Sequence, residues 1–179
     1  MERLPVVEWL RSPVTRKMAD LERKALQPES RDALVEFAAS LSKSPPAESR
    51  LLLVHRLYDS VKTCDMEVEV TISLVQTVAL AIGPALPKEK RYTPAELGKA
   101  LGPVKSRYRS IMKNARLVRY LFAYQSVSDA ELEEQVSFLE SENGKWFVSQ
   151  VERGFNDAGE AISKALGSDI PRNLRPKRP

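Results

Sequence analysis

Few residues of this 179-residue chain have the type and spacing that enzymatic or metal chemistry requires. The chain has one histidine, His55, and one cysteine, Cys64, so a zinc site would lack ligands, and both are better explained as structural residues. Ser110 and Lys113 have the Ser-x-x-Lys spacing of some serine nucleophiles, but the companion motifs of the β-lactamase class are absent. We therefore predict no catalytic residue, no metal site, no cofactor and no enzymatic activity.

Phosphate-binding and calcium-binding motifs are also missing from the sequence. It contains neither a GxGxxG nor a Walker A loop, and no GxSxG nucleophile turn. Asp65, Glu67 and Glu69 alternate, yet a calcium loop would also need a glycine turn and a terminal acid.

The clearest charge pattern is a basic face on a helix predicted over residues 104–124. Between Lys105 and Arg119 the chain has six bases and no acid, and five of them fall within about 120° of the helix circumference. They are Lys105, Arg109, Lys113, Arg116 and Arg119. The other side, expected to face the core, holds Val104, Ile111, Ala115, Val118 and Phe122.

Two explanations of this face stay open. The basic face could bind successive phosphates of a polyanion or the headgroups of an anionic lipid. The segment Asp129–Glu142 has six acids and no base, and as an antiparallel neighbour it could instead neutralise the basic helix through Glu131, Glu134 or Glu140. We favour internal neutralisation or a plain solvated face, and we do not expect nucleic acid as a partner.

Composition predicts one globular domain over residues 1–170. Hydrophobic residues make up 42% of the chain, charged residues 29%, and prolines outnumber glycines by twelve to seven, which favours helices that begin at proline. The net charge of +4 equals the four bases of residues 171–179, so the rest is neutral and this tail should be extended and disordered. The longest apolar stretch, near Val75–Ile82, is too short for a membrane span of about 20 residues.

Helix start signals organise the chain into eight or nine helices without a sheet. Ser12 followed by Pro13 predicts a helix start, and capping boxes begin at Thr93 and Ser128. The segment 65–75 alternates like a strand but has no partner strand, so we predict a central helix, apolar nearly all round. Gly102-Pro103 should end one helix and Gly167 should cap the last. The last helix should bury Phe147, Val148, Val151, Phe155, Ala158, Ile162 and Leu166.

The sequence also contains an internal repeat with an offset of 129 residues. Trp9 aligns with Phe138, Ser12 with Ser141, Arg16 with Lys145 and Met18 with Phe147. Each copy predicts a short helix, a sharp bend at the serine and a longer helix. The expected fold is therefore an all-α, irregular multi-helix bundle with two related bent-helix units, near residues 5–26 and 128–166.

The second copy carries a family resemblance. The stretch Ser128–Val148 resembles an uncharacterised family of exported bacterial all-helical proteins, the domain of unknown function numbered two thousand and fifty-nine. Its motif residues are Glu131, Leu132, Phe138, Ser141, Gly144 and Phe147. The stretch Trp9–Glu22 is similar to a variant of the same motif, with Thr15 at the position where glycine is usual.

This resemblance implies an all-helical fold, a periplasmic or secreted location and no assigned activity. We accordingly expect a non-enzymatic binding protein of the bacterial envelope, with an unknown protein or envelope component as its partner. The alternative is a module that binds polyanions or anionic lipid through the basic face. Because the first repeat copy begins partway into a unit, we also expect an N-terminal segment, such as a leader, to precede Met1.

Overall fold

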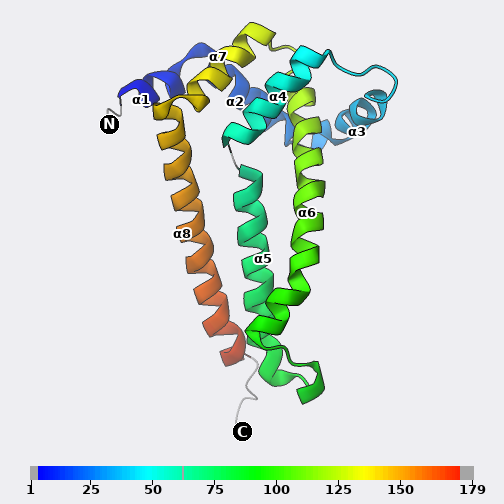
Figure 1. The fold of residues 1–179 in the computed structure, drawn as a ribbon, viewed down its shortest axis with the longest axis vertical. Coiled ribbons are helices and arrows are strands. Elements are labelled where there is room, and N and C mark those ends of the chain that lie inside the picture. Colours follow the sequence, from blue (N-terminus) through cyan, green and yellow to red (C-terminus); the bar gives the residue numbers. More distant parts are fainter. Residues whose placement is uncertain (1–3, 62, 174–179) are drawn as a thin grey trace. The chain divides into compact units, whose positions relative to one another are not determined.

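The structure, a computed structural model, describes residues 4–61 and 63–173 except for the side chains of Thr63 and Cys64. Within these ranges it contains helices and no strand, which confirms the prediction of an all-α multi-helix bundle (Figure 1). The α-helices are α1 (Leu4–Arg11), α2 (Pro13–Ala25), α3 (Arg31–Ser40), α4 (Glu48–Val61), α5 (Thr63–Ile82), α6 (Pro94–Ala123), α7 (Asp129–Glu140) and α8 (Glu142–Asn173). Three short 3₁₀ helices are η1 (Pro28–Ser30), η2 (Gly83–Ala85) and η3 (Lys88–Lys90).

The chain divides into two compact units. Unit 1 comprises Met1–Lys62 and Lys113–Gln150, and unit 2 comprises Thr63–Met112 and Val151–Pro179, so α6 and α8 contribute to both. The sequence predicts a single domain over 1–170, and whether the two units fold together stays a prediction. Residues 174–179 of the predicted disordered tail lie outside the described residues.

Unit 1 has a well-filled apolar core. Helices α4 and α7 lie against each other, and α7 also contacts α2 (Figure 1). Leu132 and Val136 on α7 and Val54 on α4 have almost no exposed surface. Of the buried apolar residues in the described chain, sixteen belong to unit 1 and four to unit 2. Apolar burial is the main stabilising term in folding, so unit 1 has most of what a stable fold requires.

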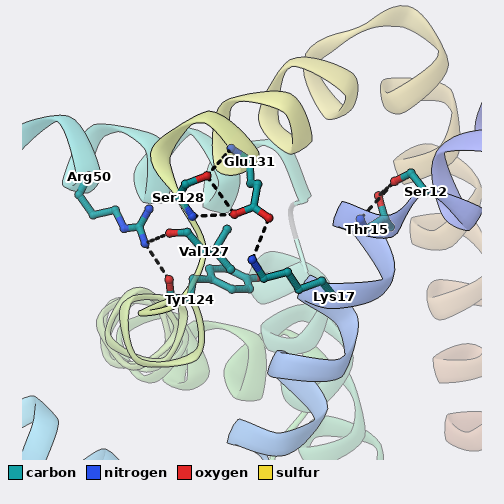
Figure 2. Close-up of polar contacts among 8 residues, drawn as sticks. All are labelled: Ser12, Thr15, Lys17, Arg50, Tyr124, Val127, Ser128 and Glu131. Atoms are coloured by element: carbon teal, nitrogen blue, oxygen red, sulfur yellow. Dashed lines mark hydrogen bonds and ion pairs between the residues drawn. The ribbon is translucent and has the colours of Figure 1, made fainter.

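Arg50 on α4 fixes the short connection between α6 and α7. Its guanidinium donates hydrogen bonds to the main-chain oxygens of Tyr124 and Val127 (Figure 2). It also forms an ion pair with Asp129. The side chain of Arg50 is only 15% exposed, so these carbonyls are satisfied by a charged donor that is largely shielded from water. Ser128 then begins α7 with the predicted capping box.

Both predicted bends are present, and each has a serine at its centre. α1 ends at Arg11 and α7 at Glu140, and Ser12 and Ser141 have extended backbone conformations with ψ of 148° and 165°. The Ser12 hydroxyl oxygen accepts the N–H of Thr15, and the Ser141 hydroxyl oxygen accepts the N–H of Gly144. Each serine therefore caps the longer helix that follows it.

Aromatic side chains from the two bends stack on each other. The rings of Trp9 and Phe138 lie 4.4 Å apart and nearly parallel, and Phe147 meets Trp9 edge-on at 5.4 Å. Trp9 also donates its ring N–H to the side-chain oxygen of Gln135. Trp9 therefore packs at its bend.

The carboxylate of Glu131 joins α7 to α2 and should make unit 1 acid-sensitive. It accepts hydrogen bonds from Lys17 Nζ and from the N–H and hydroxyl of Ser128, all between 2.8 and 2.9 Å (Figure 2). These bonds, that of Lys17 first, lower the pKa of Glu131 from 4.5 to about 2. A lowered pKa in the folded state contributes stability that is complete above the unfolded value and lost as pH falls.

We therefore expect the free energy of unfolding to fall between about pH 5 and pH 2, and Glu131→Gln to remove part of that slope. Urea unfolding at a series of pH values measures both proteins. Glu29→Gln, at an exposed 3₁₀ position, is the matched control and should follow the wild type. Parallel curves for wild type and Glu131→Gln would contradict this role.

Unit 2 departs from several predictions. α5 is a helix as expected and lies between α6 and α8 (Figure 1), but it is not buried all round, because Val75 and Val78 on it are exposed. α6 runs without interruption through Pro103, so the predicted break was wrong. Gly102 and Pro103 are exposed, and water can therefore satisfy the carbonyl that proline leaves unpaired.

The last helix is longer than predicted. α8 continues beyond Gly167 to Asn173, so Gly167 is not its cap and residues 171–173 of the predicted tail are helical. A Cβ on Gly167 would lie 3.6 Å from Cγ2 of Thr77 on α5. This is an ordinary van der Waals distance, so Gly167 lies beside α5 within the helix instead of ending it.

Candidate interaction surface

Within unit 2, α8 approaches α5 closely at Gly159. A Cβ at this position would come within 2.8 Å of a Val70 methyl group, so the approach depends on glycine. Gly159 is buried, whereas Ser163 and Leu166 on the same side of α8 are half-buried.

A neighbouring side of α8 is uncovered, and we call it the α8 face. Its three large side chains, Val151, Phe155 and Ile162, are 42%, 41% and 50% exposed. Small exposed residues lie between them, namely Gly154, Ala158, Ala161 and Ala165. The sequence predicts that Val151, Phe155, Ala158 and Ile162 are buried, and the structure shows that this is wrong.

No charged side chain interrupts the α8 face. At 100° per residue the seven residues span about 120° of the helix circumference. Arg153, Asp157, Glu160 and Lys164 all project from the opposite half of the helix. An apolar stripe that would normally face a protein core is here exposed to water.

The other helices of unit 2 also expose apolar residues. Val104 and Ile111 on α6 are 52% and 54% exposed, although the sequence predicts that this side faces the core. Ala115, on the part of α6 that belongs to unit 1, is exposed as well. In the described part of unit 2 the buried apolar residues are Met66, Val68, Ala81 and Leu97. A unit of this size with so small a core gains little stability from its own packing.

The predicted basic face is largely engaged, but with other partners than expected. In unit 2, Lys105 pairs with Glu69 at 2.5 Å, and Arg109 pairs with Asp65 at 2.8 Å and Glu69 at 3.0 Å. In unit 1, the ammonium of Lys113 lies 5.1 Å from the ring centre of Tyr58. The acids come from α5, so the prediction that α7 would supply them was wrong.

The acids of α7 pair with α2 and α4 instead. Arg56 on α4 binds both Glu133 and Glu140, at 2.8 and 2.6 Å, and these bonds lower the pKa of each carboxyl. The remaining two bases of the predicted face, Arg116 and Arg119, are half-buried on the part of α6 that belongs to unit 1.

Arg116 lies near a half-buried carboxyl in unit 1. Glu22 on α2 accepts a hydrogen bond from the hydroxyl of Tyr124. Burial raises the pKa of Glu22, while the Tyr124 hydrogen bond and the charge of Arg116 oppose that rise. Burial also raises the pKa of Tyr124, so the phenol stays protonated and remains the donor. The arrangement gives the half-buried carboxyl of Glu22 a hydrogen-bond donor and a nearby positive charge.

Residues that could support catalysis or metal binding are not brought together. His55 and Ser110 are exposed on separate helices, and the side chain of Cys64 lies outside the described residues. Among the described side chains, no group of three His, Cys, Asp or Glu residues could hold a metal ion. A cleft of about 270 Å³ between α5 and α8 is lined partly by Glu69 and Glu160, but it is smaller than typical ligand pockets of about 300–1,000 Å³.

One stretch of the described chain, Asp65–Ala85, is long and apolar enough to cross a membrane by length and composition, which differs from the prediction that the longest apolar stretch, near Val75–Ile82, is too short. Only 11% of it is buried, whereas the core helix of a soluble protein is mostly buried. Its first turns carry Asp65 and Glu69, which are paired with bases of α6. Like α8, this helix displays apolar surface that unit 2 does not cover.

Sequence reasoning found these apolar residues but assigned them to the core. Helical periodicity shows that one side of a helix is apolar. The same periodicity arises whether that side packs on the chain's own core or on another molecule. The small core of unit 2 is visible only in the structure. Comparison of the chain with models of protein families, with curated proteins and with solved structures found no match.

Proposed function

We propose that this protein is a non-enzymatic interaction protein that binds a helical partner through the exposed apolar helices of unit 2. The observation that carries the proposal is the α8 face, a stripe of seven uncharged residues of which three are large, apolar and at least 41% exposed. Continuous apolar stripes of this kind on a soluble protein mark sites of protein association.

The energetics favour a partner of helical form. Complete burial of a valine, isoleucine or phenylalanine side chain stabilises by about 1.5–3 kcal/mol, and Val151, Phe155 and Ile162 have gained only part of it. A narrow stripe along one helix matches the apolar side of another helix, which it can meet over several turns. The α8 face would also have a second role. Because the core of unit 2 is small, the apolar residues of a partner would complete that core.

For its location we propose the bacterial envelope, in the periplasm or outside the cell. The support is the resemblance of Ser128–Val148 to a family of exported helical proteins. We also propose that the two bent-helix segments are related units. Their support is the shared serine cap and the stacking of Trp9 on Phe138, the residue with which it aligns in the repeat.

We favour this function over the alternative of binding polyanions or anionic lipid. Binding a polyanion through the basic face would compete with the acids that already engage Lys105 and Arg109. The α8 face has no such internal competitor. The opposite half of α8 carries Asp157 and Glu160 as well as Arg153 and Lys164, so α8 lacks the excess of bases that attracts an anionic surface.

Photo-crosslinking in cells that produce the full protein tests the proposed function. With Phe155→p-benzoylphenylalanine, irradiation should give a discrete adduct of higher mass, because the probe lies at the centre of the α8 face. The same probe at Val35, 63% exposed on α3 of unit 1, is the matched control and should give no adduct. Absence of an adduct at Phe155, or the same adduct at both sites, would reject the proposal.

A further inference from the structure

We propose that the partner on the α8 face is the α8 helix of a second copy of this chain, in antiparallel orientation. This inference rests on the proposed function and names its partner. It follows from three properties of the α8 face: the spacing of its residues, the alternation of large and small side chains, and the placement of charge.

The spacing is that of a helix–helix seam. Val151, Phe155, Ala158, Ile162 and Ala165 follow one another at steps of four, three, four and three residues. This 3.5-residue average is the repeat of coiled coils, in which it keeps one seam in contact with a second helix along its whole length. A globular core requires no such strict repeat.

The side chains of the face are self-complementary when two copies are antiparallel. If the two-fold axis passes Ala158, each large residue lies level with a small residue of the other copy, because the residue numbers of level positions add to the same total. Val151 is then level with Ala165, Phe155 with Ala161, and Ile162 with Gly154.

A parallel pair would place each large residue level with its own copy, Phe155 with Phe155 and Ile162 with Ile162, which crowds these layers. In the antiparallel pair only Ala158, at the axis, meets its own copy, and the large residues pack against small ones.

Charge placement agrees with a second copy better than with a membrane surface. The face itself is uncharged, so pairing two copies buries no ion. A helix that lies on anionic lipid is typically bordered by lysines and arginines, whereas α8 carries both signs, including Glu152, Asp157 and Glu160.

The length of the seam sets the expected strength of the dimer. Residues 151–165 cover about 21 Å of helix, which is short for a standard interface of about 800 Å² per partner. Small interfaces belong to weak, reversible complexes, so we expect a dissociation constant in the micromolar range. The full chain should therefore change from monomer to dimer between about 1 and about 200 µM.

Sedimentation velocity over this concentration range tests the pairing. Ile162→Lys should raise the dissociation constant at least tenfold, because it places a charge in the seam. Val35→Lys makes a similar change on an exposed site of unit 1 and should leave the constant unchanged. Circular dichroism confirms that both variants keep their helix content. A wild type that stays monomeric, or an Ile162→Lys variant that dimerises like the wild type, would overturn the inference.

Disulfide trapping tests the orientation in a Cys64→Ser background. Ala158→Cys should form a covalent dimer, since the two-fold axis brings the two copies of residue 158 together. Ala165→Cys, on the same face, is the control and should form little, because the antiparallel pair separates the two copies of residue 165 by about 21 Å, whereas a parallel pair would bring both positions together. Equal trapping at both positions would contradict the antiparallel seam.

The crosslinked adduct in cells separates failure of this inference from failure of the proposed function. An adduct at Phe155 with twice the mass of the chain supports the second copy. An adduct with a different protein would reject the second copy while the interaction function stands. No adduct would reject both.

Discussion

Gly144→Ala should destabilise unit 1 by about 3 kcal/mol, a large effect for the addition of one methyl group. A Cβ at this position would lie 2.1 Å from the main-chain oxygen of Phe138, 2.5 Å from the Cα of Leu139 and 2.7 Å from its oxygen. These are backbone atoms of α7 just before the bend at Ser141. The methyl group can be accommodated only if α7 and α8 separate, which would also disturb the Ser141 cap and the nearby Trp9 stack.

The matched control for this variant is Gly98→Ala on α6, where nothing lies within 4 Å of the added Cβ. Alanine is the better helix former by about 1 kcal/mol, so Gly98→Ala should be neutral or stabilising. Urea unfolding followed by tryptophan fluorescence is suitable because Trp9 and Trp146 both belong to unit 1. Equal stabilities for the two variants would show that the bend can relax around a side chain.

The bends were predictable because their signals are local. Ser12-Pro13 and the capping box at Ser128 each determine a helix start within four residues, and the structure begins α2 and α7 where they predict. The requirement for glycine differs between the bends. Thr15 aligns with Gly144, but in the first bend the side chain of Thr15 is buried and hydrogen bonded to Ser12 and Gln135.

Burial was less predictable than helix position, because it depends on contacts between distant segments. The sequence predicts that α5 is central and that the stripe of α8 is buried, since both are strongly apolar. The structure leaves Val75, Val78 and Ile162 exposed. Periodicity identifies an apolar side, whereas the structure is needed to show that the chain has too few neighbouring helices to cover it.

The ion-pair partners were also hard to predict from the sequence, because they too depend on contacts between distant segments. The basic segment of α6 and the acidic segment of α7 are adjacent in sequence, which makes mutual pairing the simplest prediction. Arg109 instead pairs with Asp65, and Glu140 pairs with Arg56. Nearness in sequence did not decide the ion-pair partners, because α7 packs on α4. The candidate site therefore changed from a charged face to an apolar one only when the helix neighbours were known.

Gln135→Leu is the second substitution with a large expected effect, and it tests how the two bends are joined. The Gln135 side-chain oxygen accepts the ring N–H of Trp9 at 3.1 Å and the buried hydroxyl of Thr15 at 2.9 Å. Leucine has a similar size but accepts neither bond, so two donors lose their partner at about 1–3 kcal/mol each. We expect a loss of about 3 kcal/mol in the free energy of unfolding.

A double-mutant cycle separates these hydrogen bonds from simple loss of packing. Thr15→Val removes one of the two donors, so the double variant should lose less stability than the sum of the single variants, by about 1 kcal/mol. Gln125→Leu, at an exposed site, is the control and should change stability by less than about 0.5 kcal/mol. Strict additivity in the cycle would mean that Gln135 acts only by filling space. A positive coupling would mean that one buried amide holds residues 120 and 126 positions away in sequence, and with them both bends.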